Sequence, residues 1–297
     1  MDSSILIKEV NSKKELNEFV CFPFKLYKNH PFWVGPIINE ELEVLDKQLN
    51  PVFKNAISRY FLAYKNDRIV GRIAAIINWI EVKEVKKSKI RFGWFDVEDD
   101  LNITRQLLDK VIEFGKENNL NHVEGPVGFS NMDKAGMLID GFDELNTMIT
   151  LYNYPYYSKH LESLGYEKLA QWVEYEIKIS SFEDSPEKIR RFSKLILDRS
   201  SLKILNFKSN KEILPYVDQM FDLLGKTYDK LQTFVPIQPH QIKYYKEKYF
   251  NYIHPDFIKC AVDKDNNLVA FLITMPSFSK ALKKINGKLF PFGFLRI

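Results

Sequence analysis

The chain is poor in cysteine: only Cys21 and Cys260 occur among 297 residues. Two thiols this far apart in sequence supply neither a disulfide framework nor a thiolate zinc site, and a reducing cytoplasm suits them. The amino-terminal residues MDSSILIKEV lack the basic segment and apolar stretch of a secretory signal, and every apolar run is far shorter than a membrane span. We therefore expect a soluble cytoplasmic protein.

Charge of one sign is also lacking. The 43 Lys and Arg residues nearly balance 39 Asp and Glu residues, for a net charge of +4, and no block of basic residues stands out. The five histidines are never spaced as metal ligands are. We expect neither a nucleic-acid partner nor a bound metal. What the chain does have is 45% hydrophobic and 14% aromatic residues, enough for the cores of two domains or of one large one.

The first 50 residues predict one strand and two helices. Ser4 to Val10 alternates apolar and polar side chains, as a strand does. Ser12 and Glu15 then have the spacing of a capping box and should begin a helix, which Pro23 is expected to interrupt. Asn39 to Leu49 has helical apolar spacing.

The next stretch predicts a hairpin and then a βαβ unit. In order, we expect strands at 59–65 and 69–77 around a turn at Asn66-Asp67-Arg68, a strand at 90–97, a helix at 101–118 and a buried strand at 121–127. A connection as long as this helix joins parallel strands, so the last two strands should be parallel. A loop rich in glycine and polar residues, Gly125 to Gly141, a helix at 156–164 closed by Gly165, and one or two closing strands at 166–179 should follow.

The second half repeats the opening of the first. Helices are expected at 186–200, 211–231 and 240–250, a strand at 202–207, and a hairpin at 257–262 and 268–275. We place the boundary in the polar stretch before Pro186, giving domains 1–180 and 181–297. The second copy lacks its later strands, so a truncated chain is expected. The apolar, basic segment Lys280 to Ile297 could lie on a membrane surface, but we favour its packing against a missing remainder.

Three stretches carry a resemblance to a known family: FPFKLYKNHPFWVGP from Phe22, EGPVGFSNMDKAGMLIDGFDE from Glu124, and YNYPYYSKHLESLGYEK from Tyr152. With the order of elements, they resemble the GNAT (Gcn5-related N-acetyltransferase) superfamily, and most closely its tandem-domain, uncharacterised bacterial members. The resemblance implies an α/β fold with a mixed, mostly antiparallel central sheet flanked by helices, duplicated with the second copy incomplete.

The resemblance also implies acetyl-CoA or another acyl-CoA as co-substrate, with its pantetheine arm inserted between the two parallel strands. The diphosphate would sit at the start of the crossover helix, where free N–H groups favour anions. The corresponding residues here are Phe95, Val97, Asn102, Ile103, Thr104 and Arg105. Asp100, Asn102 and Thr104 stand about where the family has glycines. The carboxylates of Asp99 and Asp100 would repel a diphosphate and weaken its site.

For the chemistry, the resemblance implies Tyr157 as the proton donor to the departing thiolate, with Tyr156 as its neighbouring alternative. Asp96 and Glu98 end the central strand, near where a general base would sit. A backbone N–H near Phe95 to Val97 would stabilise the oxyanion. Aromatic packing of the tyrosines and solvation of the two carboxylates are the structural alternatives.

The loop after the buried strand is the candidate acceptor site, because small polar residues after such a strand typically line a pocket. Its expected substrate-binding residues are Ser130, Asn131, Asp133, Gly136 and Asn153. An ordered loop that satisfies its own backbone through Asx turns is an equal alternative.

Two functions follow. The first is an N-acyltransferase that moves an acyl group, expected to be acetyl, from acyl-CoA to an unidentified small-molecule amine, without a membrane partner. The other is a GNAT-like ligand-binding or scaffold module that has lost its cofactor. The retained Tyr157 helix favours the enzyme, and the carboxylates at Asp99 and Asp100 favour the module.

Overall fold

The computed structural model describes residues 4–147, 149–178, 181, 183–231, 233–250 and 253–296. The chain divides into two compact units. Unit 1 comprises Met1–Leu169, Thr233–Val235 and Ser277–Ile297, and unit 2 comprises Ala170–Gln232 and Pro236–Pro276. The segment after Pro276 therefore packs within unit 1 and not within the second half of the chain. The division of the sequence into domains 1–180 and 181–297 stays a prediction.

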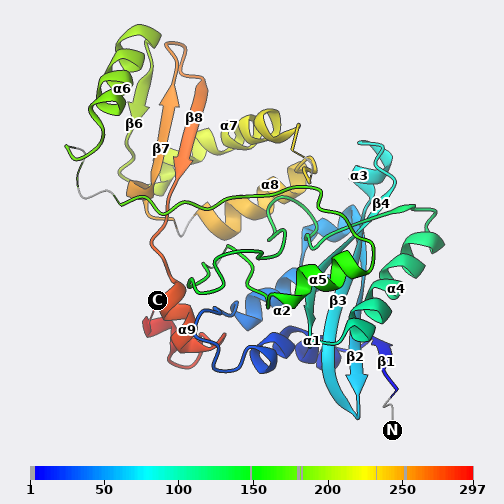
Figure 1. Cartoon of the computed structure of the whole chain (residues 1–297). Coiled ribbons are helices and arrows are strands. Elements are labelled where there is room, and N and C mark those ends of the chain that lie inside the picture. The colour runs from blue at the N-terminus through cyan, green and yellow to red at the C-terminus, as the bar shows by residue number, and fades with distance from the viewer. Residues whose placement is uncertain are drawn as a thin grey trace. The chain divides into compact units, whose positions relative to one another are not determined.

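Unit 1 is built on a five-stranded sheet in the order β1-β2-β3-β4-β5 (Figure 1). The strands are β1 (Leu6–Glu9), β2 (Ala56–Lys65), β3 (Arg68–Asn78), β4 (Lys89–Val97) and β5 (His122–Glu124). All neighbours are antiparallel except β4 and β5, which are parallel. The helices of unit 1 are α1 (Lys13–Leu26), α2 (Ile38–Leu45), α3 (Trp79–Lys83), α4 (Leu101–Glu117), α5 (Tyr156–Ser163) and α9 (Ser279–Ile285), with 3₁₀ turns at Pro51–Lys54 and Gly293–Arg296. The expected mixed, mostly antiparallel sheet flanked by helices is confirmed.

The sheet buries both of its faces, because successive strand side chains point to opposite sides. On β3, Ile73 packs in the core beneath α4 and α5, whereas Ala74 and Ile76 pack in the core beneath α1 and α2. The turn between β2 and β3 has positive φ at Asn66 and Asp67, 52° and 58°, as a tight hairpin requires. The alternating pattern and turn chemistry in the sequence therefore predicted this hairpin correctly.

Helix α1 starts where the capping box predicts but continues through Pro23. The Ser12 hydroxyl accepts a hydrogen bond from the Glu15 N–H at 3.2 Å, which caps the helix. Pro23 has no N–H, so it cannot bond the Phe19 carbonyl four residues earlier. Arg72 of β3 donates to that carbonyl from Nη1 at 2.9 Å. The expectation that Pro23 interrupts the helix is wrong, because the sheet supplies the missing donor.

Two expected strands differ from the structure. Strand β5 ends at Glu124, three residues before the predicted end, and its side chains are only half-buried or exposed. Closing strands were expected at 166–179; residues 166–178 form no strand, and residue 179 lies outside the described residues. Tyr166 packs against the core of unit 1, but the later apolar side chains are exposed, as at Trp172 (60%) and Tyr175 (82%). An alternating apolar pattern does not form a strand unless a sheet edge is there to pair with it.

Unit 2 repeats the opening of unit 1. It contains α6 (Glu187–Ser200), β6 (Lys203–Leu205), α7 (Asn210–Tyr228), α8 (Pro239–Tyr245) continued by a π-helix (Lys246–Phe250), a 3₁₀ turn (Pro255–Phe257), β7 (Ile258–Val262) and β8 (Leu268–Ile273). Strand β6 pairs antiparallel with β7, and β7 pairs with β8, as β1 does with β2 and β2 with β3. In the described part of unit 2, counterparts of β4 and β5 are absent. The duplicated fold with an incomplete second copy is therefore confirmed.

Candidate active site

The candidate site lies at the carboxyl end of β4, where β4 and β5 separate. Their pairing covers only Lys89 to Arg91, opposite His122 to Glu124. Farther along β4, the Val97 N–H donates to the Tyr157 hydroxyl at 2.9 Å. The Val97 carbonyl accepts from the Tyr156 hydroxyl at 2.7 Å. Two adjacent tyrosines of α5 therefore occupy both backbone groups of Val97 on its open edge.

Tyr157 begins a buried chain of hydrogen bonds. Its hydroxyl lies 3.0 Å from the hydroxyl of Tyr27, which donates to Oδ1 of Asp96 at 3.1 Å. Arg72 donates to Oδ2 of Asp96 from Nε at 2.7 Å. Tyr157 and Tyr27 are each 1% exposed, and Asp96 is 8% exposed. The sequence placed Asp96 and Tyr157 in the site separately, and the structure joins them through Tyr27.

The direction of these hydrogen bonds follows from which group donates each one. The single proton of Tyr27 goes to Asp96, so the Tyr157 proton points to the Tyr27 oxygen. Burial, followed by the charge of Asp96, raises the pKa of Tyr157 well above its ordinary value, and burial likewise raises that of Tyr27. Both phenols keep their protons at neutral pH. The arrangement can hold a proton at the Tyr157 oxygen in a water-excluded setting.

Aromatic rings enclose this chain. Tyr27 stacks between Trp33 and Tyr154, with ring centroids 5.2 and 5.1 Å away. Phe95, one of the expected co-substrate residues, packs its ring against Tyr157 at 5.4 Å. The alternative of aromatic packing for the tyrosine cluster is therefore correct as a description, and it coexists with the hydrogen-bonded chain.

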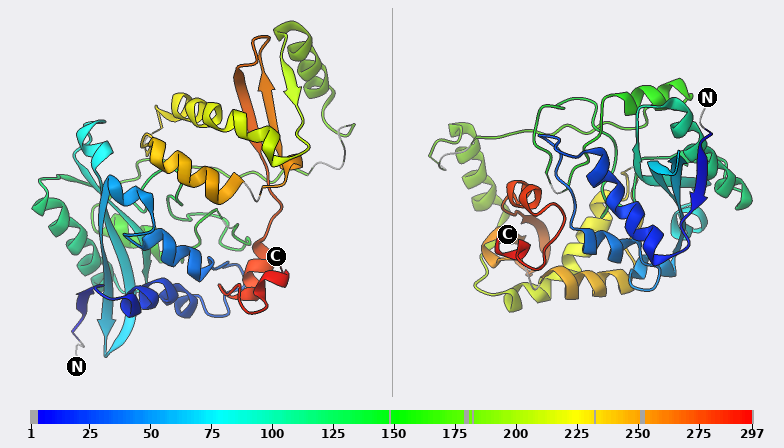
Figure 2. Two further views of the ribbon diagram at one scale, coloured as in Figure 1. Left: turned by 180° about the vertical axis from the view of Figure 1, so that it is seen from behind. Right: turned by 90° about the horizontal axis from the view of Figure 1, so that it is seen from below.

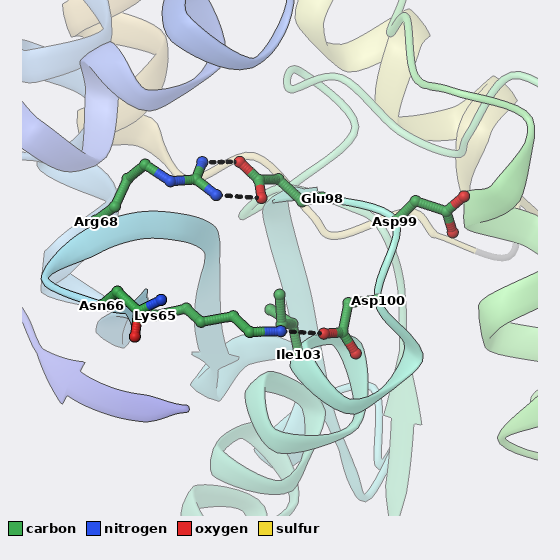
Figure 3. Close-up of a pocket in the computed structure, with 7 residues that line it drawn as sticks. All are labelled: Lys65, Asn66, Arg68, Glu98, Asp99, Asp100 and Ile103. Atoms are coloured by element: carbon green, nitrogen blue, oxygen red, sulfur yellow. Dashed lines mark hydrogen bonds and ion pairs between the residues drawn. The ribbon is translucent and has the colours of Figure 1, made fainter. Parts of the chain in front are cut away.

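Glu98 does not join Asp96. Its carboxylate forms a two-pronged ion pair with Arg68 across a pocket of about 430 Å³ at the start of α4 (Figure 3). Lys65 crosses the same pocket to Asp100 at 3.1 Å. This pocket coincides with the expected diphosphate position, since Ile103 lines it, but both of its cations are already paired with carboxylates.

The first turn of α4 is likewise satisfied by its own chain. Asp100 caps the helix, and its Oδ1 accepts from the Asn102 N–H at 2.9 Å. Its backbone carbonyl accepts from the N–H groups of Ile103 and Thr104. Arg105 reaches back to the Asn102 side chain. A diphosphate would have to displace the bonds of Asn102, Ile103 and Thr104, whereas the bond to Asn102 engages only Nη1 of the exposed Arg105 guanidinium.

Thr104 and Asp99 meet at a histidine. The Thr104 hydroxyl, fully buried, lies 2.9 Å from Nδ1 of His160, and Nε2 of His160 lies 3.1 Å from Asp99. Asp99 is thus directed toward α5 and away from the pocket of Lys65, although its backbone lines that pocket. The sequence did not indicate His160 as a partner of either residue.

The predicted acceptor loop is held by bonds within the chain. Asp133 accepts from the Ser130 N–H at 3.0 Å, and Gly136, with φ of 85°, donates to the Pro126 carbonyl at 2.7 Å. Asn153 bonds both the N–H and the carbonyl of Leu138. These contacts match the ordered-loop alternative, and an acceptor-binding role for the loop stays a prediction.

Asn131 ties a distant part of unit 1 to this loop. Its Oδ1 accepts from the Val235 N–H at 3.1 Å, and its Nδ2 donates to the Thr233 hydroxyl at 3.2 Å. Arg91 of β4, itself bonded to Glu81, donates to the Thr233 carbonyl at 2.9 Å. Asn131 is therefore engaged by the Val235 backbone and the Thr233 side chain.

Besides His160, the sequence missed three residues near the site: Tyr27, Arg72 and Lys134. Tyr27 lies inside one of the stretches that carry the family resemblance, which was the only available signal. Lys134 belongs to the acceptor loop. Burial lowers its pKa despite the opposing charges of Glu41 and Asp96, so this amine is more easily deprotonated than an ordinary lysine.

Two further observations concern the described residues alone. They contain no cluster of three His, Cys, Asp or Glu side chains that could hold a metal ion. They also contain no helix with the length and apolar character needed to cross a membrane.

Two curated relatives match the chain over almost its full length. Protein YghO of Escherichia coli (strain K12) is 25% identical over 98% of this chain and 73% of its own. The bacterial ceramide synthase of Caulobacter vibrioides (strain NA1000 / CB15N) is 23% identical over 100% of this chain and 76% of its own. No protein-family model matches the chain.

Among the solved structures that the chain resembles are acetyltransferases and a tandem GNAT protein. A tandem GNAT protein from the clavulanic acid biosynthesis pathway covers 92% of this chain and 76% of its own, with 10% identity and a TM-score of 0.46. A predicted acetyltransferase from Clostridium acetobutylicum, solved with acetyl-CoA, covers 58% of this chain and 96% of its own, with 13% identity and a TM-score of 0.37. The resemblance to the GNAT superfamily is confirmed.

Proposed function

We propose that the chain is an N-acyltransferase, which moves an acyl group from an acyl-CoA thioester to a primary amine and forms an amide. The observation that carries this proposal is the buried chain from Tyr157 through Tyr27 to Asp96 at the separated end of β4. In the reaction the amine nitrogen forms a bond to the thioester carbon and gives up a proton to solvent water, the carbon–sulfur bond breaks, and the thiolate takes a proton from an acid that solvent then reprotonates. We assign that proton to Tyr157, whose hydroxyl would turn from Tyr27 to the thiolate for this last step.

The residues divide into two roles. Tyr157 is the candidate acid, because its raised pKa keeps the phenol protonated at neutral pH and its hydroxyl lies against the Val97 backbone at the open edge of β4. Tyr27, Asp96 and Arg72 position it. The ion pair with Arg72 keeps Asp96 as an acceptor, so that Tyr27 and then Tyr157 have one orientation.

Co-substrate binding must exchange contacts that the chain now makes with itself. A thioester arm lying along the open edge of β4 would take the Val97 groups from Tyr156 and Tyr157. A diphosphate at the start of α4 would take Arg68 from Glu98 and Lys65 from Asp100. Both exchanges replace existing hydrogen bonds, which makes moderate affinity the expectation.

The acceptor is proposed from the ceramide synthase relative. A ceramide is the amide of a long-chain amino alcohol, so an enzyme of that name joins an acyl group to an amphiphilic amine. The match extends over the whole of this chain. We extend that chemistry to this protein and propose a long-chain amino alcohol as acceptor, with acetyl and long fatty acyl groups as the donors to compare.

The test pairs two donors with two amines. Acetyl-CoA or palmitoyl-CoA is incubated with sphinganine or with ethanolamine, which has the same head group without the chain, and thiol release and amide mass are measured. Amide formation with sphinganine that is lost in Tyr157→Phe supports the proposal. If no combination of donor and amine releases thiol, the proposal is rejected.

One observation favours the second function, a ligand-binding or scaffold module without a cofactor. Both Val97 backbone groups and both pocket cations are already engaged. Calorimetric titration with CoA separates the two functions, because the module binds no CoA at millimolar concentration, whereas the enzyme shows saturable binding.

A further inference from the structure

The carboxyl-terminal segment, Ser277–Ile297, is anchored on unit 1. Helix α9 buries Leu282 and Ile285 against Val34. The Gly287 carbonyl accepts from the Ile38 N–H at 2.9 Å, and Lys283 donates to the Pro31 carbonyl. Both views of Figure 2 show this segment, in red, beside the blue link between α1 and α2. Phe278 and Leu289, on either side of α9, pack against the same cluster, so the segment packs within unit 1, whereas the sequence led us to expect packing against a missing remainder.

The anchored segment leaves three large aromatic side chains uncovered. Phe290, Phe292 and Phe294 are 71%, 72% and 50% exposed. The rings of Phe290 and Phe294 lie 5.9 Å apart and form one cluster. Isolated exposed aromatics are ordinary, but three within five residues on a fixed segment mark an interaction surface.

The charged residues of this segment itself are all of one sign. Between Ser277 and Ile297 the sequence has four lysines, one arginine and no aspartate or glutamate. Lys280, Lys284 and Lys288 are exposed. Lysines beside bare phenylalanines fit a partner that has anionic groups at its surface and an apolar layer just beneath, and an anionic lipid bilayer has both.

We propose that this segment docks the chain on anionic membranes, with the three phenylalanines inserted at the headgroup level and the lysines against lipid phosphates. The cluster has no directional hydrogen-bonding side chain of its own, which suits a fluid surface better than a structured protein partner. The proposal takes up the membrane-surface alternative for this segment and departs from our expectation that no membrane takes part.

The docking surface is connected to the candidate site. A Cβ on Gly287 would lie 2.5 Å from the Phe24 ring, so the backbone of the segment rests directly on that ring. Phe24 meets Trp33 edge to face at 5.0 Å, and Trp33 stacks on Tyr27. Docking would hold the site beside the bilayer, where an amphiphilic amine is concentrated; this last step rests on the proposed function.

Vesicle flotation of the full chain tests the docking. At 0.1 M salt we expect at least tenfold more binding to vesicles of 70% phosphatidylcholine and 30% phosphatidylglycerol than to pure phosphatidylcholine. The variant F290S/F292S/F294S should lose about tenfold of that binding, as should K280E/K284E/K288E. The matched control is Phe192→Ser, which alters a phenylalanine of α6 that is 49% exposed.

The possible results separate docking from catalysis. Circular dichroism checks that each variant is folded, and acyl transfer to ethanolamine, which needs no membrane, is followed in parallel. Loss of vesicle binding in both triple variants, with the Phe192→Ser control unaffected, supports the proposal even if no acyl transfer is found. Equal binding to neutral and anionic vesicles, or binding that the triple variants retain, overturns it.

Discussion

The backbone N–H of Val97 donates to the side-chain oxygen of Tyr157 at 2.9 Å. This contact places the candidate acid on the same strand edge that an incoming thioester would use. A residue of α5 therefore both completes β4 and supplies the proton of the proposed reaction. Removing the Tyr157 hydroxyl should therefore change both the free energy of unfolding and turnover, each by its own amount.

Replacing Tyr157 by Phe keeps the ring between Phe95 and Tyr156 and removes only the hydroxyl. We expect a loss of about 1 kcal/mol in the free energy of unfolding, for the unpaired Val97 N–H. Turnover should fall by an order of magnitude or more if Tyr157 is the acid. Denaturant unfolding and steady-state kinetics measure the two effects, and unchanged turnover would remove the catalytic assignment.

Asp96→Asn should be among the most destabilising changes to the site. It leaves the Arg72 guanidinium buried opposite a neutral group, and breaking a buried ion pair from one side costs about 3 kcal/mol. The matched control is Glu98→Gln, because its pair with Arg68 is exposed and worth less than about 1 kcal/mol. Equal unfolding free energies for the two variants would show that Asp96 is not held as described.

Asp100→Asn should strengthen CoA binding. Asparagine caps a helix as well as aspartate does, so α4 is preserved while Lys65 loses its partner. One carboxylate fewer at about 4 Å from a phosphate is worth roughly 1 kcal/mol in water, or about fivefold in affinity. Calorimetry at low and high salt checks this, with Asp109→Asn on the same helix as control. Affinity that is insensitive to salt and to Asp100 would place the diphosphate elsewhere.

The stability of the acceptor loop should depend on pH through Asp133. Burial raises the pKa of this carboxyl from 3.8 to about 6. Its stabilising contribution is therefore complete below pH 3.8 and is lost as the pH rises through about 6. Asp133→Asn keeps the acceptor for the Ser130 N–H but does not titrate. Between pH 4 and 7, the free energy of unfolding of this variant should therefore rise relative to that of the parent chain. A constant difference over that range, matching that of the exposed Asp140→Asn control, would contradict the raised pKa.

Local patterns predicted the elements of unit 1 well, because their causes are local. The Ser12 and Glu15 spacing marked the start of α1, and Asn66-Asp67 marked the β2–β3 turn. The residues at 166–178 failed for the opposite reason. Their alternation is that of a strand, but a strand also needs a neighbouring edge, which no local pattern records.

The candidate site was predictable only in part. Tyr157 and Asp96 came from the family resemblance and the end of a strand. Tyr27 and Arg72 join them through contacts between residues 69 and 24 positions apart in sequence, which composition and spacing do not reveal. The carboxylates at the start of α4 were recognised as a departure, but their pairing with Lys65 and Arg68 required the fold.

Pro23 leaves one backbone hydrogen bond of α1 unformed, and Arg72 of β3 bonds the freed Phe19 carbonyl. A residue with an N–H at this position would claim the Phe19 carbonyl for the helix and compete with Arg72 for it. Pro23→Ala should then improve the helix considered alone, yet loosen the side chain that orients Asp96. Pro23, the residue of α1 least suited to a helix, thus leaves a carbonyl through which Arg72 links α1 to the hydrogen bonds of Asp96, Tyr27 and Tyr157.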